Sequence, residues 1–343
     1  MAARLQPPGE APASVALPSG GLHFAGDVRN VGAAVSSAPA APASTATPPS
    51  RAAVFVRRLG STVVLWAVVL WTIFSPNHAI TNWVFLAILL TLAGLGLREF
   101  YDLVERRGLG CFRRWGLVAG LTLMVSTFLY FTGLIPHAHA ELAAKANDFE
   151  IGIIVVFVLG LCIRRFLDRS TTDGLAAMST TLFGLMYVPW LLNFLQKIVF
   201  LPGIDGRYYV LFFILVTKLS DVGAYVTGSL LGRHKMIPRI SPGKTWEGFA
   251  GALVFSTAAS VLFAQFLGHR LAGMNLGHAV LLGLLLSAAA VVGDLIESLL
   301  KREAGVKDSG RLLPGIGGVL DLLDSLLFNA PLMYLYLRHV LTR

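Results

Sequence analysis

Long apolar segments recur along the chain, and short polar or charged segments separate them. Each is close to the roughly 20 residues that an α-helix needs to cross a hydrocarbon core of about 30 Å. They lack the alternation of a membrane β-strand, and backbone groups in lipid must be paired within helices or closed barrels. The pattern predicts an all-α polytopic membrane protein with about nine transmembrane helices. The expected spans are 54–75, 80–103, 115–135, 151–168, 178–200, 208–231, 248–268, 277–300 and 317–337.

Composition agrees with this class. Hydrophobic residues make up 55% of the 343 residues and charged residues only 14%, which excludes an ordinary soluble domain. Residues 1–50 are rich in Ala, Pro and Ser, which predicts a disordered tail without chemistry. No signal-peptide core is expected there. The two cysteines predict neither a disulfide framework nor a redox centre.

Charge in the connecting segments predicts an orientation. Segments on one side of the nine spans carry 19 Lys and Arg residues, and those on the other side carry 6. Because Lys and Arg are retained on the cytoplasmic side, we expect a cytoplasmic N-terminus in a multi-pass protein of the cell (inner) membrane. The same bias explains the net charge of +9 without a nucleic-acid partner. We expect two membrane regions after the tail, 51–205 and a catalytic region 206–343.

The most unusual polar stretch is Asp294–Ser325, which lies between apolar runs. Asp294 and Glu297, together with Ser298 and Lys301, have the spacing of one helix face, and Asp321 and Asp324 share another. Ionisable groups at the edge of a membrane span are costly and usually functional. Carboxylates aimed at one point repel each other unless a cation lies between them, and Mg²⁺ fits oxygen ligands. The alternative is a solvated loop.

A second polar stretch begins in the span 208–231, where Lys218, Ser220 and Asp221 interrupt the apolar run. Lys218 and Asp221 lie three residues apart, so a structural ion pair is the alternative to a site. The basic loop 232–248 follows, in which we expect turns rather than strands. Its Thr245 has the position of a helix cap.

Topology predicts that both polar stretches meet. The relevant ends of the spans fall on the cytoplasmic side, together with the basic loop. The residues expected to converge there are Asp221, Lys244, Asp294, Lys301, Asp321 and Asp324. By contrast, Arg98, Glu99 and Asp102 are interpreted as an interfacial helix end without a role in the site.

The stretch SLLKREAGVKDSGRLLPGIGGVLDLLDS closely resembles the signature of the phosphatidate cytidylyltransferases, also called CDP-diacylglycerol synthases. The segment KLSDVGAYVTGSLLGRHKMIPRISPGKTWEG resembles the second region of that family. Together they cover about the C-terminal third of the chain. Two positions depart from the pattern, because Ile316 stands where the family has His and Leu322 where it has Arg.

The resemblance implies transfer of a cytidylyl group from CTP to phosphatidic acid, giving CDP-diacylglycerol and pyrophosphate at the lipid bilayer. It implies one or two Mg²⁺ ions held by Asp221, Asp294, Asp321 and Asp324, which with Lys301 form the expected catalytic set. The expected substrate-binding residues are Ser220, Arg239, Lys244, Thr245, Ser298, Arg302, Lys307, Asp308, Gly317 and Gly318.

Two alternatives remain open. The changes at Ile316 and Leu322 are compatible with a paralogue that acts on another lipid phosphate, such as an isoprenoid one. They are also compatible with a catalytically weak membrane scaffold, although a scaffold has no need of costly intramembrane carboxylates. A homodimer is compatible with either, and the sequence identifies no face for it.

Overall fold

The computed structural model describes residues 67, 70–72, 75–135, 142–168, 174–310 and 317–342. The chain divides into two units, Met1–Pro48 and Pro49–Arg343, and every described residue belongs to the second. The predicted tail and most of the first predicted span lie outside the described residues.

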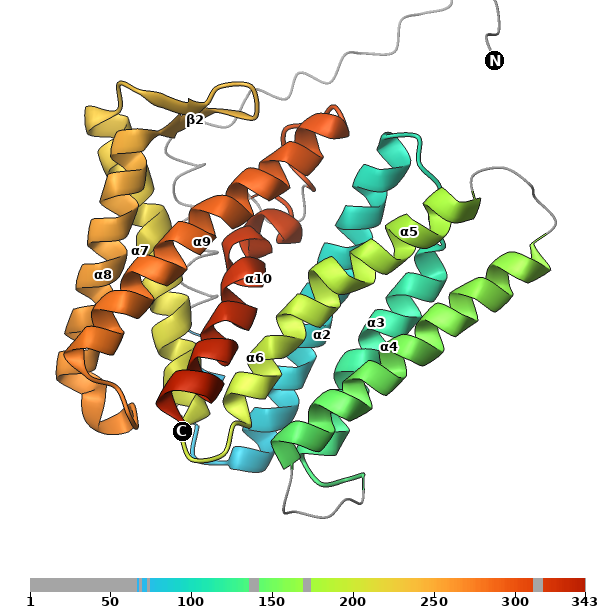
Figure 1. Cartoon of the computed structure of the whole chain (residues 1–343), viewed down its shortest axis with the longest axis horizontal. Coiled ribbons are helices and arrows are strands. Elements are labelled where there is room, and N and C mark those ends of the chain that lie inside the picture. Colours follow the sequence, from blue (N-terminus) through green and yellow to red (C-terminus); the bar gives the residue numbers. More distant parts are fainter. Residues whose placement is uncertain are drawn as a thin grey trace, which may run out of the picture. The chain divides into compact units, whose positions relative to one another are not determined.

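The described elements are almost all helical (Figure 1). In chain order they are α2 His78–Arg106, α3 Arg113–Phe131, α4 Leu142–Leu167, α5 Gly174–Leu185, the π-helical turn Met186–Trp190, α6 Leu191–Val199, α7 Gly206–Leu231, β1 Lys235–Ile237, β2 Ser241–Thr245, α8 Trp246–Leu267, the 3₁₀ turn Gly268–Arg270, α9 Leu276–Glu303, α10 Val319–Tyr336 and the π-helical turn Leu337–Leu341.

Eight helical segments of the described residues are long and apolar enough to cross a membrane, and one of them consists of α5, the π-helical turn and α6 together. They run over Ala79–Arg106, Arg113–Phe131, Ala146–Leu167, Gly174–Val199, Gly206–Leu231, Trp246–Arg270, Leu276–Glu303 and Val319–Leu341. The predicted spans from the second to the ninth are confirmed, as is the all-α membrane class. The side of the membrane on which each end lies stays a prediction.

α10 is the most buried span of the bundle. It packs against α2 and α6 on one side and α7 and α9 on the other, so it joins the two predicted membrane regions (Figure 1). Its core-facing residues, including Leu320, Leu323 and Leu327, are fully buried.

Glycines let α7 and α8 approach closely. A Cβ built on Gly223 would lie 2.7 Å from the carbonyl oxygen of Gly251, and one on Gly248 would lie 2.9 Å from that of Ala224. In lipid, the hydrophobic effect does not drive helices together, and small residues at a crossing allow the close packing that does. α7 and α8 therefore form a closely packed pair beside α9.

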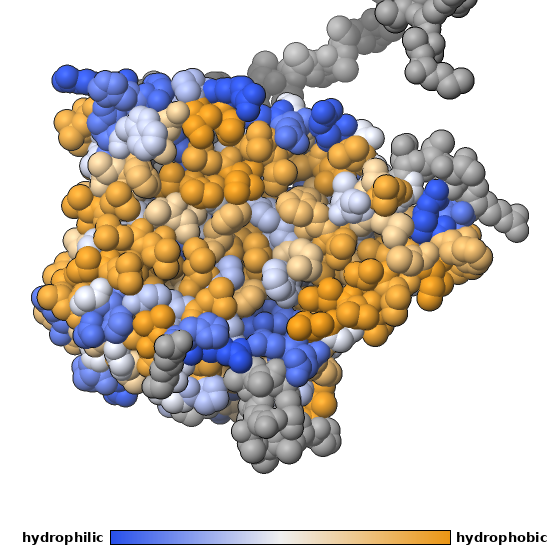
Figure 2. Space-filling view, in the orientation of Figure 1, coloured by the Kyte–Doolittle hydropathy of each residue, from blue (hydrophilic) through white to orange (hydrophobic). Residues whose placement is uncertain are grey.

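Apolar side chains cover the middle of the helices and hydrophilic ones gather at their ends (Figure 2). On α4, Val156 is 69% exposed and Phe166 is 86% exposed. Such a band is what a bilayer core requires of helix surfaces that no other helix covers.

The loop after α7 departs from the prediction. We expected turns without strands, but β1 and β2 pair as an antiparallel hairpin with Lys235 opposite Thr245. Each strand is short, and β2 contains Pro242 and Gly243, which conceal the strand in the sequence. The prediction for Thr245 is confirmed, because it is the N-cap of α8 and accepts a hydrogen bond from Gly248 N–H at 3.1 Å.

Candidate active site between α7, α9 and α10

A cavity of about 490 Å³ opens beneath the hairpin, between α7, α8, α9 and α10. Polar side chains from four separate elements reach it, with Tyr225, Ser241 and Thr245 near its hairpin side. The charged residues that line it are Lys218, Asp221, Lys244, Asp294, Asp321 and Asp324. The convergence predicted from topology is therefore confirmed for five of its six residues, and the sixth, Lys301, contacts Asp321.

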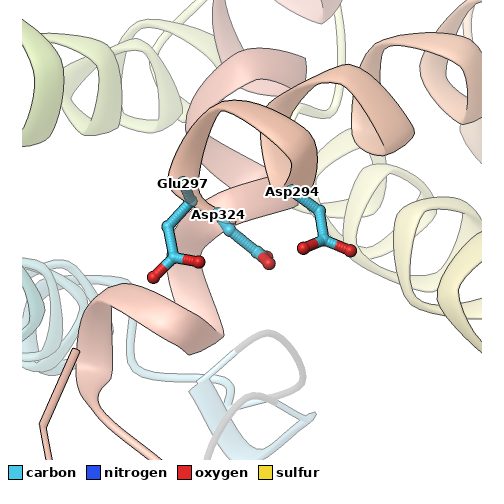
Figure 3. Close-up of side chains that lie close together, drawn as sticks. All are labelled: Asp294, Glu297 and Asp324. Atoms are coloured by element: carbon cyan, nitrogen blue, oxygen red, sulfur yellow. The ribbon is translucent and has the colours of Figure 1, made fainter. Parts of the chain in front are cut away.

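Close contact between α9 and α10 creates the acidic part of the cavity. A Cβ on Gly293 would lie 2.6 Å from the carbonyl oxygen of Asp324, so only glycine lets the two backbones come so near. Asp294 follows Gly293 directly and thereby lies beside Asp324. One carboxylate oxygen from each of Asp294, Glu297 and Asp324 lies within 4.8 Å of the others. Figure 3 shows the three side chains pointing to the same side.

Lys301 links Glu297 to Asp321 across the two helices. Its ammonium pairs with Glu297 Oε2 one turn earlier on α9 and with Asp321 Oδ1 at 2.6 Å. The second oxygen of Asp321 accepts hydrogen bonds from Ser309 N–H at 3.0 Å, from the Ser309 hydroxyl at 2.8 Å and from Gly318 N–H at 2.8 Å. Asp321 thus fixes the first turn of α10 as well as lining the cavity.

Lys218 holds α7 against α10. Its ammonium donates to Asp221 Oδ2, to the Ser325 hydroxyl and to the carbonyl of Leu322, each at 3.2 Å. The ion pair considered as an alternative in the sequence therefore exists, and it lines the cavity. Leu322 takes part in this contact through its backbone carbonyl.

The hairpin adds a third lysine to the cavity. Lys244 of β2 pairs with Asp294 Oδ2 at 2.8 Å and donates to the carbonyl of Val291 at 3.2 Å. Arg302, at the end of α9, donates through Nε to the carbonyl of Ile240 in the hairpin turn. These contacts fasten the hairpin over the cavity.

The acidic cluster has the chemistry of a divalent-cation site. Glu297 is fully buried, and its Oε1 has no hydrogen-bond partner among the described residues. A buried carboxylate oxygen without a donor is costly unless a cation or water meets it. Asp294 and Asp324 bring two further oxygens to the same point, and Mg²⁺ is bound by such hard oxygen ligands.

Several predicted substrate-binding residues do not line this cavity. Ser220 is buried and shares a hydrogen bond of 2.8 Å with Ser287 of α9. Lys307 and Asp308 line a separate hollow beside α2. Arg239 is exposed in the hairpin turn, and the Ser298 hydroxyl donates to Asp294 at 3.4 Å. Gly318 N–H is already bound by Asp321, and Gly317 has a φ of 114°.

Two carboxylates of this region were not in the predicted site. Glu297 was visible in the sequence, since it shares a helix face with Asp294 and Lys301. Glu99 gave no such signal. Glu99 was interpreted as part of an interfacial helix end, and the sequence did not predict that it is 7% exposed and accepts a hydrogen bond from Leu320 N–H on α10 at 2.8 Å.

Cys111 is a free, half-buried cysteine in the connection between α2 and α3. Burial, with the Glu105 carboxylate nearby, raises the pKa of its thiol to about 11. Since the thiolate is the reactive form, this thiol stays protonated near neutral pH.

These features define an α-helical membrane protein with an acidic cavity that also contains lysines, as sites for polyanions with divalent cations do. The model of the cytidylyltransferase family matches residues 57–340, and the chain belongs to that family.

Among its relatives, a phosphatidate cytidylyltransferase of Mycobacterium leprae is 45% identical over 152 residues, which are 44% of this chain and 47% of that protein. One of Mycobacterium bovis is 39% identical over 185 residues, 52% of this chain and 58% of that protein. An Escherichia coli protein named uncharacterized protein YnbB is 31% identical over 280 residues, 80% of this chain and 85% of that protein. The matches to the two mycobacterial enzymes span about half of their length.

Proposed function

We propose that this protein transfers the cytidylyl group of CTP to phosphatidic acid and releases pyrophosphate. The names of the mycobacterial relatives favour this activity. The observation that carries the proposal is the cavity itself, where carboxylates and lysines from α7, α9, α10 and the hairpin converge near the ends of membrane spans.

The reaction is a displacement at phosphorus. A phosphate oxygen of the lipid forms a bond to the α-phosphorus of CTP, while the bond from that phosphorus to the oxygen bridging to the β-phosphate breaks. Pyrophosphate leaves with the bonding electrons. A lipid phosphate is already ionised near neutral pH, so the protein needs no strong base. Its task is to hold two polyanions in line and balance their charge.

Lysines from separate elements would perform the positioning. Lys244 of β2 forms an ion pair with Asp294, and Lys218 lines the same cavity from α7. An ammonium group binds phosphate as a point charge and adapts to changing geometry. Tyr225, Ser241 and Ser229 offer hydroxyl groups on the hairpin side. We infer that CTP enters from this side and that the lipid phosphate arrives between the helices.

Mg²⁺ would be held by Asp294, Glu297 and Asp324, with Asp221 on the neighbouring wall. The cation supplies neutralisation of the phosphates that CTP and the lipid bring together. Asp321 was predicted as a ligand, but both of its oxygens already accept bonds from Lys301, Ser309 and Gly318. We propose that it orients Lys301 and the first turn of α10.

The test is an assay with purified protein in detergent micelles, Mg²⁺, labelled CTP and phosphatidic acid, which follows a lipid-soluble cytidine product. We expect product from the wild type and none above background from Asp324→Asn. Asp205→Asn is the matched control, because Asp205 lies before α7, exposed and without a side-chain cap bond. Turnover by folded Asp324→Asn at the wild-type rate contradicts the assignment of the site.

Another lipid phosphate is the second candidate acceptor, since Leu322 replaces the arginine of the signature. The same assay with an isoprenoid phosphate in place of phosphatidic acid separates the two. Product with the isoprenoid phosphate alone assigns the second acceptor, and no product with either lipid favours a scaffold.

We also propose that the cavity faces the cytoplasm of the bacterial cell, as the bias of 19 against 6 basic residues predicts. A single cysteine at Arg239 or at Asp205 would report the two faces, in a background where Cys111 and Cys162 are replaced by serine. A membrane-impermeant maleimide added to intact spheroplasts should label Asp205→Cys and spare Arg239→Cys. The reverse pattern contradicts the orientation.

A further inference from the structure

Glu99 of α2 lies against the first turn of α10, more than 200 residues away in the chain. Its Oε2 accepts a hydrogen bond from Leu320 N–H at 2.8 Å and lies 3.1 Å from the Ser309 hydroxyl oxygen. The side chain is almost fully buried. A carboxylate is placed in such surroundings only where it has a structural partner or a function.

The beginning of α10 explains why a distant residue is needed. Its N-cap is Gly318, which has no side chain to accept bonds from the free N–H groups of the first turn. Asp321 accepts from Gly318 N–H, and Glu99 accepts from Leu320 N–H. A negative charge is also favourable at the N-terminus of a helix. Glu99 therefore acts as the cap that the local sequence omits.

Glycine at 318 is itself a consequence of this arrangement. A Cβ on Gly318 would lie 2.4 Å from Glu99 Oε2 and 2.1 Å from the Ser309 hydroxyl oxygen. A Cβ on Gly310 would lie 2.2 Å from Glu99 Oε1. The two glycines thus leave a slot that the Glu99 carboxyl fills.

Ser309 connects this slot to the site. Its hydroxyl oxygen lies 3.1 Å from Glu99 Oε2 and 2.8 Å from Asp321 Oδ2. Asp321 in turn binds Lys301, which pairs with Glu297. A continuous set of contacts therefore runs from α2 to the acidic cluster, although Glu99 does not line the cavity.

We propose that Glu99 is a positioning residue that fixes Ser309 and the first turn of α10, so that Asp321 and Lys301 take their places in the site. This inference rests on the proposed function. We assign the role to the hydrogen-bond acceptor, because Leu320 N–H and the Ser309 hydroxyl both lie against the same carboxylate oxygen.

Three variants test it. Glu99→Ala removes the acceptor, and Glu99→Gln keeps an oxygen of similar position. Asp102→Ala is the matched control, since it removes a carboxylate one turn further along α2. Asp102 pairs with Arg113 at 2.6 Å and contacts α3 rather than α10 through this bond.

Two measurements are made on the purified proteins. Hydrogen exchange followed by mass spectrometry reports the first turn of α10 independently of catalysis. In Glu99→Ala we expect faster exchange in peptides covering 317–325 and unchanged exchange in α8. In the assay, we expect kcat to fall about 10–100-fold with KM for CTP within about threefold, as for residues that orient a site without touching substrate. Glu99→Gln should restore both, and Asp102→Ala should match the wild type.

The outcomes separate this inference from the proposed function. Glu99→Ala with wild-type exchange and wild-type kcat overturns the positioning role. Faster exchange with unchanged kcat per folded molecule also overturns it, because the contact would then be structural only. Failure of Glu99→Gln to restore kcat overturns the assignment to the acceptor. An inactive wild type overturns the proposed function instead, while the exchange result still reports the contact.

Discussion

Among the described residues, two clusters of charged side chains differ in their balance of positive and negative charge. The cluster at the far end of α4 and α6 is a single pair, Lys197 with Glu150, whose side chains are 4% and 3% exposed. Asn193 and Asn147 complete their hydrogen bonds, and the Lys197 ammonium lies 4.4 Å from the centre of the Phe194 ring. One positive charge meets one negative charge in closed surroundings.

The cluster at the cavity carries an excess of acid. Three lysines face five carboxyl groups, a formal excess of two negative charges, counted over Lys218, Lys244, Lys301, Asp221, Asp294, Glu297, Asp321 and Asp324. A balanced pair such as Lys197–Glu150 is sufficient where the charges only connect helices. The difference agrees with the proposed Mg²⁺ site, because an unbalanced cluster beside a cavity leaves negative charge that a cation can neutralise.

The largest expected effect comes from comparing one variant of each cluster. Asp324→Asn should lower kcat/KM at least about 1000-fold with little change in stability, because it removes a carboxylate that would contact the cation. Glu150→Gln should leave turnover within about threefold but lower the free energy of unfolding by about 3–5 kcal/mol, since Lys197 is left buried without its partner. The assay and thermal unfolding in detergent measure these. Equal losses of activity in both variants would contradict the distinction.

The spacing of α9 and α10 gives the next effect. Gly293→Ala should push α10 from α9, since its Cβ would meet the Asp324 carbonyl at 2.6 Å, and we expect turnover to fall about 10–100-fold. Gly152→Ala is the matched control, because a Cβ there meets nothing within 4 Å. A Gly293→Ala enzyme with wild-type kcat would show that the acidic cluster tolerates a wider separation.

Binding of Mg²⁺ can be compared between variants of the two clusters without measuring catalysis. At a concentration about 100 times the dissociation constant, a cation that binds only the folded protein stabilises it by about 2.7 kcal/mol. We expect a rise in the thermal midpoint with Mg²⁺ in the wild type and in Glu150→Gln, and none in Asp294→Asn. A rise that persists in Asp294→Asn would move the cation away from this cluster.

The smallest effect concerns Ser220, which was predicted to bind substrate. Its hydroxyl is buried against Ser287, outside the cavity. Ser220→Ala should therefore change KM for CTP by less than about twofold and cost about 1 kcal/mol of stability, the value of one hydrogen bond. Steady-state kinetics and thermal unfolding decide this, and a tenfold rise in KM would return Ser220 to the substrate site.

The sequence predicted the spans well because hydrophobic length alone determines them. The predicted 277–300 and the observed Leu276–Glu303 show how close such limits come. It also predicted that Asp294, Asp321 and Asp324 lie at one end of the bundle, since helix spacing and the alternation of spans place them there. It did not predict that Glu297, rather than Asp321, lies beside Asp294 and Asp324. The hairpin was missed because Pro242 and Gly243 oppose strand propensity. Glu99 was missed because its partner lies 221 residues away, and no local pattern records such a contact.

The length of α9 has a consequence for the position of Asp294 in the bilayer. A helix of 28 residues is about 42 Å long, which exceeds a hydrocarbon core of about 30 Å. Its excess length is accommodated by tilt or by emergence from the bilayer. Asp294, nine residues before the last residue of α9, lies about 14 Å along the axis from that end, and in the proposed reaction the lipid phosphate must come to this level. With the proposed lipid substrate, the enzyme should respond to the mole fraction of that lipid in the surface rather than to its bulk concentration. Diluting that surface with inert detergent at constant total lipid should slow it, while adding vesicles of unchanged composition should not.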